Sequence, residues 1–523
     1  MKKYIINLKK FGSVALLGSI ALVMSCTDSF DNINTDKNKI SELTPSMLPF
    51  LFSKVQSTAT NDGGNYQIAQ NLFHDQYCQY FANTTTYFPS DRLVIRMDWI
   101  RAAWNPIYTE VVPQLQIILA ETAPASAEHA LANLMWVYTF HRLTDTWGPV
   151  PYKSAGIPAT AVPYDPQDII YNDLFLRLDS VVATLDNFQG GNAFGDFDLI
   201  YDGNLDKWKK FANTLRLRLA VRISDVEPAR AKTEGEKAAA SGTLTTSPSD
   251  DALIKRTTKG DDYNGLSIMD WNEFRMSAAM ESVLKGYDDP RMPVYFLPAK
   301  TTGDYEDLRN GLTSADMAAP LNKADANSHH GDRWNSTVGL ETPSNVMATA
   351  EADFLKAEGV LLGWNMGGGT AKSHYENGIR NSMLQWGITD NTVINAYISS
   401  TNTPIAPGDF LNSAPLTDVP VLWGAAPDVQ REQITLQKWL ALYPEGVEAW
   451  ADIRRSGALK LYPVANSDNP DLPSSPANPA TNWIRRIPFI NDEKVSNTAE
   501  VRKAEDLLPG PDNIITPLWW DKN

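Results

Sequence analysis

Residues 206–224 read DKWKKFANTLRLRLAVRIS. Apolar residues recur here at spacings of three and four, which places their side chains on one face of an α-helix. Period-two alternation, the mark of half-buried strands, is scarce in the chain. The chain is therefore expected to be mainly α-helical with long loops. The other segments with helical spacing are 46–60, 66–82, 98–122, 127–147, 168–185, 274–287, 348–364, 373–388 and 432–456.

Several predicted helices follow one another after short connections. Small residues such as Ala350, Ala352 and Ala357 allow neighbouring helices to approach closely. This pattern is typical of stacked tetratricopeptide-type hairpins, although no clean repeat of about 34 residues can be aligned. We therefore predict a tetratricopeptide-like stack of helical hairpins.

Long segments without helical periodicity interrupt the predicted stack. They cover about residues 82–97, 242–345 and 400–428, and the last part of the chain is also rich in loops. Loops of this length are uncommon in compact domains unless they carry function. The sequence therefore predicts a long loop-rich face that binds a ligand.

The N-terminus has the layout of a lipoprotein export signal. Lysines precede an uncharged stretch at 11–24, which is shorter than the roughly 20 residues that span a bilayer. Val23-Met24-Ser25-Cys26 then resembles a bacterial lipobox, in which the cysteine carries lipid. We predict a lipoprotein signal peptide at 1–25, a lipidated tether at 26–43 that starts at Cys26, and one domain at 44–523. An ordinary export signal is the alternative.

The composition excludes some classes of partner. The 523 residues carry a formal net charge of −16, with no basic run to attract nucleic acid or anionic lipid. No later segment is apolar enough to span a membrane, so a lipid on Cys26 would be the only anchor. Cys78 is then the one remaining cysteine, and we expect it to be buried in a helix.

Metal sites are weakly indicated. His329 and His330 lack a third nitrogen or sulfur ligand at usual spacing. Asp196, Asp198 and Asp202 lie in an oxygen-rich stretch that could bind calcium, but Ile200 occupies the third ligand position of the EF-hand order. We interpret the stretch as a turn before the next helix, with calcium as the alternative; no other cofactor is predicted.

Catalytic motifs are also missing from the sequence. No Gly-x-Ser-x-Gly motif occurs, and the glycine-rich stretch 367–372 lacks phosphate-loop spacing and is expected to be an interhelical turn. No pair of carboxylates stands out by its spacing as in a glycosidase. A binding protein is favoured over a glycan hydrolase, which remains the alternative.

Aromatic residues in the loops give the positive signal. A flat ring packs on the C–H face of a sugar while neighbouring Asn, Asp and Arg side chains bind the hydroxyls. The stretches FANTTTYFPSDR and HHGDRWNST combine these residue types. The predicted ligand-binding residues are Asn83, Tyr87, Trp99, Asp332, Arg333 and Trp334.

Several stretches together resemble the SusD/RagB family of outer-membrane nutrient-binding lipoproteins of the Bacteroidetes. They occur in family order over almost the whole chain after Cys26. The stretches are LTDTWGPVPYKSA (143–155), DKWKKFANTLRLRLAVRIS (206–224), ADFLKAEGVLLGW (352–364), QKWLALYPEGVEAWADIRRSG (437–457), RRIPFINDE (485–493) and LWWDKN (518–523).

The resemblance implies four tetratricopeptide-like hairpins and a non-catalytic role. It implies a protein anchored in the outer membrane by lipid, facing the cell exterior, which hands an oligosaccharide or peptide to a SusC-like TonB-dependent transporter. Its motif residues Trp208, Asn213, Arg216 and Arg218 are expected to build the core and interhelical bonds rather than bind ligand. A scaffold lipoprotein without a soluble ligand is a further alternative.

Overall fold

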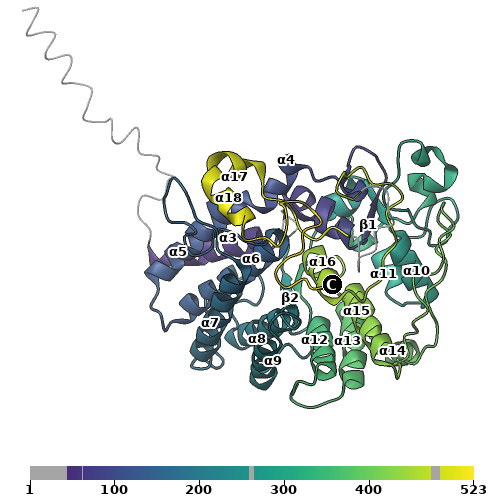
Figure 1. Cartoon of the computed structure of the whole chain (residues 1–523). Helices are drawn as coiled ribbons and strands as arrows, with labels where there is room; N and C mark the ends of the chain where they lie inside the picture. Colours follow the sequence, from purple (N-terminus) through teal and green to yellow (C-terminus); the bar gives the residue numbers. More distant parts are fainter. Residues whose placement is uncertain (1–43, 62, 258–263, 473–482) are drawn as a thin grey trace, which may run out of the picture. The chain divides into compact units, whose positions relative to one another are not determined.

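The computed structural model describes residues 44–61, 63–257, 264–472 and 483–523, and Pro49–Asn523 form one compact unit. Figure 1 shows that helices dominate this unit. The predicted signal peptide, the tether and Cys26 lie outside the described residues. No helix in the described part of the chain is long and apolar enough to cross a membrane.

Long helices pack side by side in a stack. Neighbours in this stack are α5 with α6, α6 with α7, α7 with α8, α8 with α9 and α12, and α12 with α13 and α15. The predicted mainly α, tetratricopeptide-like fold is thereby confirmed. The stack consists of α5 (Val112–Glu121), α6 (Ala127–Trp147), α7 (Gln167–Leu185), α8 (Leu205–Arg222), α9 (Pro228–Ser241), α12 (Thr349–Leu361), α13 (Ala371–Gln385), α15 (Pro427–Leu442) and α16 (Gly446–Ser456).

Local sequence signals set where these helices begin. Ser126 caps α6 by accepting a hydrogen bond from the backbone N–H of His129 at 3.2 Å, and Asn204 caps α8 in the same way. Thr370 and Ser373 form a capping box at α13. Gly367, Gly368 and Gly369 before it all have positive φ, so the expected interhelical turn is confirmed.

The rest of the unit consists of short elements. Two antiparallel strand pairs, β1 with β3 and β2 with β4, join segments far apart in sequence, and Asn83 lies opposite Phe274 in the first pair. The strands are β1 (Phe81–Asn83), β2 (Ala252–Ile254), β3 (Phe274–Met276) and β4 (Ser344–Met347). The short α-helices are α3 (Leu48–Ala59), α4 (Met97–Ile100), α10 (Ala278–Gly286), α11 (Met292–Tyr295), α14 (Asn391–Ile398), α17 (Asn491–Ser496) and α18 (Thr498–Glu505).

Short segments of other helix types complete the loop-rich part. The π-helical segments are η2 (Gln67–Asp75), η5 (Ile107–Val111) and η7 (Leu266–Asp270). The 3-10 turns are η1 (Pro45–Met47), η3 (Ser90–Arg92), η4 (Arg101–Ala103), η6 (Gly195–Phe197), η8 (Asp316–Ala318), η9 (Pro320–Asn322), η10 (Ala324–Ala326) and η11 (Asp332–Trp334).

Some predicted helices were wrong in extent. The segment 98–122 is broken into α4, η4, η5 and α5, because Pro106 cannot donate a hydrogen bond within a helix. Pro444 likewise separates α15 from α16 in the segment 432–456. The predicted helices 66–82 and 274–287 each include strand residues, since β1 and β3 pair across the fold. The helices α9, α11, α14, α17 and α18 were not predicted.

Buried ion pairs on α8 connect four helices. Arg218 and Arg222 lie one turn apart and are 1 % exposed each. Arg218 donates two hydrogen bonds of 2.6 Å to Glu351 on α12. Arg222 binds Glu448 on α16 at 2.6 Å and Asp145 on α6 at 3.2 Å. These five residues are called the ionic spine, and they place α6, α8, α12 and α16 relative to one another.

The C-terminal segment completes this spine. The indole Nε1 of Trp520 donates to Asp145 at 2.8 Å, and the Tyr171 hydroxyl donates to the same oxygen at 2.6 Å. The guanidinium of Arg454 lies 3.4 Å from the ring centroid of Trp450 and 5.0 Å from that of Trp520. The residues near 520 are therefore part of the core.

A buried carboxyl group joins the spine helices to the loop-rich part. Asp75, at the end of η2, accepts hydrogen bonds from Tyr66 at 2.7 Å, from Gln70 at 3.2 Å and from the backbone N–H of Gly446 at 3.0 Å. Any Cβ on Gly446 would clash with this carboxyl group, so glycine permits the contact. Burial raises the pKa of Asp75 to about 7.

We predict that Glu351→Ala lowers the free energy of unfolding by about 3–5 kcal/mol, because buried Arg218 then loses both of its short hydrogen bonds and keeps only the carboxylate of Glu448 at 3.6 Å. The control is Glu110→Ala, which breaks an exposed pair with Lys54 and is expected to cost less than about 1 kcal/mol. Urea unfolding followed by tryptophan fluorescence measures both values. Equal losses in the two variants would contradict a structural role for the spine.

We predict that Asp75 makes the protein less stable as the pH rises. The folded-state pKa is raised above the unfolded value of 3.8, so its contribution is fully present below pH 4 and is lost as the pH rises through about 7. Between pH 5 and pH 8 the free energy of unfolding should fall by about 3 kcal/mol more in the wild type than in Asp75→Asn. Urea unfolding at four pH values measures this, and parallel pH profiles would contradict it.

Candidate ligand-binding surface

Two of the predicted aromatic residues form a surface platform. Tyr87 is 69 % exposed and Trp99 is half-buried, with their ring centroids 6.0 Å apart. The buried ring of Phe88 supports them, since it packs at 5.9 Å from Trp99 and at 6.0 Å from Phe274 on β3. Tyr87 and Trp99 are called the aromatic platform, and their rings offer an apolar surface to a ligand.

A charged pair borders the aromatic platform. The guanidinium of Arg96 lies 4.4 Å from the ring centroid of Trp99 and donates hydrogen bonds of 3.0 and 2.7 Å to Asp98. These hydrogen bonds hold the pKa of Asp98 below its usual value. The carboxylate and the guanidinium offer acceptors and donors beside an aromatic ring, which is the combination that recognises sugar hydroxyls.

Asn83 lies beneath the platform rather than on it. It is fully buried on β1, and its side-chain amide donates to the carbonyl of Phe88 at 3.3 Å. Beyond β1, the backbone N–H of Thr84 donates to the carbonyl of Glu273 at 2.9 Å. Asn83 therefore holds the loop that carries Tyr87.

The second predicted group, Asp332–Trp334, forms the turn η11, which packs against η7. Asp332 is exposed, whereas Trp334 is only 4 % exposed. The guanidinium of Arg333 lies 4.1 Å from the ring centroid of Trp386. Trp271, directly after η7, is 49 % exposed.

The six predicted ligand-binding residues thus differ in whether they lie at the surface or in the interior. Tyr87 and Trp99 are brought together at the surface, while Asn83 and Trp334 are buried within the protein. For all six residues, contact with a ligand remains a prediction. Sequence reasoning missed Arg96 and Asp98, although their place within three residues of Trp99 was a usable signal.

The remaining sequence candidates have structural roles. His330 is buried and bonds the Tyr443 hydroxyl at 2.9 Å. Asp198 accepts hydrogen bonds from Trp208, Gln56 and two backbone N–H groups, so the stretch is a turn before α8. Cys78 is buried as expected, but it lies in the turn that follows η2 and not in a helix. Across the described ranges, no three His, Cys, Asp or Glu side chains gather as metal ligands do.

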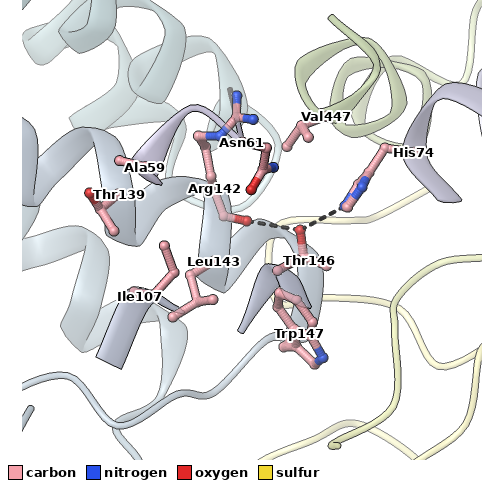
Figure 2. A pocket seen from close by; sticks show the side chains of 11 residues that line it. Ala59, Asn61, His74, Ile107, Thr139, Arg142, Leu143, Thr146, Trp147 and Val447 are labelled. Carbon is pink, nitrogen blue, oxygen red and sulfur yellow. Dashed lines mark hydrogen bonds between the residues drawn. The ribbon is translucent and has the colours of Figure 1, made fainter. Parts of the chain in front are cut away.

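An internal cavity lies between α6, η2 and α16, and Figure 2 shows its lining. His74 approaches the Thr146 hydroxyl at 3.2 Å, and Thr146 donates to the carbonyl of Arg142 at 2.9 Å. The cavity volume is about 20 Å³. That volume suits a single water molecule, so a sugar does not fit.

Comparisons with solved structures extend over most of the chain. A chitin-binding SusD homologue from Flavobacterium johnsoniae is 33 % identical with a TM-score of 0.81, over 91 % of this chain and 99 % of that one. A SusD-like protein from Bacteroides thetaiotaomicron is 30 % identical with a TM-score of 0.80, over 91 % and 99 %. A structure described as a chitin-binding protein is 26 % identical with a TM-score of 0.74, over 91 % and 100 %.

A search of curated proteins finds no match. The family model described as SusD-like, Susd and RagB outer membrane lipoprotein, matches residues 27–521. This match covers all of the helix stack, the aromatic platform and the C-terminal segment. The chain therefore belongs to the SusD-like family of outer-membrane lipoproteins.

Proposed function

We propose that this protein captures an oligosaccharide at the cell surface and passes it to a SusC-like TonB-dependent transporter without altering it. The observation that carries the proposal is the aromatic platform, where an exposed ring and a half-buried ring lie 6.0 Å apart beside an Arg–Asp pair. Rings of this kind pack on sugar faces, and the charged pair binds hydroxyls. No nucleophile or metal centre is needed for capture.

A glycan is preferred to a peptide as the ligand. Peptide capture in an extended form relies on an open strand edge or a deep groove, whereas the platform presents rings and polar side chains. Two similar solved structures are described as chitin-binding. Oligomers of N-acetylglucosamine are therefore the first ligands to test, followed by other glycans and by peptide digests.

Anchoring through Cys26 belongs to the same proposal. Lipid on the cysteine would hold the protein to the outer membrane, and two or more acyl chains give stable anchoring where a single one is reversible. The family is one of outer-membrane lipoproteins, which supports this arrangement. The ligand-binding part would then face the cell exterior, above the transporter.

We predict that Trp99→Ala and Tyr87→Ala each weaken binding of a chitin oligosaccharide about tenfold, which corresponds to about 1.4 kcal/mol per lost stacking ring. Isothermal titration calorimetry measures the affinity. Phe50→Ala is the matched control, since Phe50 is exposed and lies on α3.

Analysis of the ligand after titration should show no shortened product, as capture without catalysis requires. Unchanged affinity in both platform variants would place the ligand elsewhere. Product formation would instead favour a glycan hydrolase.

We predict that Cys26→Ala releases the protein from the membrane fraction, because the thiol is the attachment point of the lipid. Expression in a host that processes bacterial lipoproteins, fractionation and metabolic labelling with palmitate measure this. Cys78→Ala is the control and should keep both label and membrane association, since Cys78 is buried in the core. Labelling of Cys26→Ala would contradict the predicted lipobox.

A further inference from the structure

Two buried carboxyl groups face each other between α10 and the segment 304–310. Glu281 on α10 is 2 % exposed, and Asp307 is 7 % exposed. Asp307 hydrogen-bonds to Glu281, while Oε2 of Glu281 and Oδ2 of Asp307 accept no hydrogen bond from any other donor in the described part of the chain. Two ionised carboxylates cannot donate to each other, so the contact requires a proton that the two groups share.

On the α10 side of the pair, one lysine serves three carboxylates. The ammonium group of Lys285 lies 3.3 Å from Glu281, 3.3 Å from Asp304 and 3.9 Å from Glu306. It also donates to the carbonyl of Tyr305 at 2.7 Å. Because its charge is shared among these groups, Lys285 neutralises Glu281 only in part.

On the other side of the pair, the cation already has a partner. Arg309 binds Asp409 at 3.0 Å and lies 4.5 Å from the ring centroid of Tyr462, whose hydroxyl donates to a backbone carbonyl at 2.6 Å. The negative charge of Asp409 opposes the ionisation of Asp307. The carboxyl groups around the pair thus outnumber the cations, and a shared proton removes one of the excess negative charges.

The pair can exchange its protons with water. Burial raises the pKa of Glu281 to about 7 and raises that of Asp307 well above its usual range. Asp307, Arg309 and Asp409 all line a cavity of about 300 Å³, a volume that holds several water molecules. A proton can therefore leave the pair when the pH rises.

The segment that carries Asp307 also holds the two strands beneath the aromatic platform. The backbone N–H of Leu308 donates to the carbonyl of Met276 on β3 at 2.9 Å. The side-chain amide of Asn310 donates to the carbonyl of Phe81 on β1 at 2.7 Å. A movement of the segment away from α10 would therefore disturb its contacts with both strands.

We infer that Glu281 and Asp307 form a proton-dependent clasp, which holds the segment 304–310 against α10 and the β1–β3 pair and releases it when the shared proton is lost. Two buried carboxylates without a proton between them repel each other, and each requires solvent. Local opening of the segment exposes both groups to water. The clasp is a property of the fold and does not depend on the function proposed for the aromatic platform.

The clasp stabilises the closed segment at low pH. The folded-state pKa of Glu281 lies above the unfolded value of 4.5, so its contribution is present below that value and is lost as the pH rises through about 7. The raised pKa of Asp307 acts in the same direction. The segment should therefore open more readily at pH 8 than at pH 5.

Hydrogen–deuterium exchange of the full chain in detergent tests this at pH 5 and pH 8, with each rate divided by the intrinsic rate at that pH. The reporter is the Leu308 amide, whose partner lies on β3. Its protection factor should fall about seventyfold, which follows from the raised pKa of Glu281 alone. Equal protection at the two pH values would overturn the clasp.

The decisive variant is Asp307→Asn, because its amide can donate to Glu281 at every pH and has no proton to lose. Its protection at pH 8 should stay close to that at pH 5. The matched control is Asp304→Asn, which alters an exposed carboxyl group on the same segment and should keep the wild-type fall. A fall of wild-type size in Asp307→Asn would assign the pH dependence to another group, such as Asp75, and would overturn the clasp.

A second variant, Glu281→Gln, should also flatten the pH profile, and it decides the question if Asp307→Asn folds poorly. The difference between the wild type and either variant should appear in peptides that cover 278–286 and 301–312. It should be absent from α9, which packs on α8 and α12. An equal difference in α9 would show that the pair acts on the whole fold, and would overturn the clasp as a local device.

Discussion

The ionic spine on α8 is the constraint on which the rest of the structure depends. Arg218 and Arg222 are buried, so neither guanidinium is solvated. A buried guanidinium that lacks a carboxylate partner would destabilise the fold by several kcal/mol. The partners come from α6, α12 and α16. A stack held by apolar contacts alone could slip along its helix axes, whereas these bonds permit one register. The spine thus contributes specificity of packing in addition to stability.

The position of the aromatic platform depends on how the stack helices are aligned, because a few contacts connect the platform to α16. Asp75 accepts a hydrogen bond from the first residue of α16 and so positions η2. Within eight residues η2 leads into β1, whose pairing with β3 brings Phe274 beneath Phe88. Tyr87 and Trp99 pack against the buried ring of Phe88. Loops of low regularity can therefore present a preformed surface, because η2, which leads into β1, is bonded to a helix of the stack.

The sequence allowed the long helices to be predicted because their periodicity covers many turns, and the bounds of α6 agree with the predicted 127–147. Strands of three residues are too short to give a pattern, so β1 and β3 were taken as helix. In the site, the residue type alone could not separate Trp99 at the surface from Trp334 in the interior. That difference depends on which distant segments cover each ring, which local spacing does not encode.

The position of Trp520 in the core has a consequence for the order of assembly. Asp145 is made early in synthesis, yet one of its bonds comes from a residue 375 positions later in the chain. The helices from α6 to α16 can pair their charged residues before that residue is made, but Asp145 lacks one of its hydrogen-bond donors until then. The hydrogen bond between Trp520 and Asp145 therefore forms only after every helix of the stack has been synthesised.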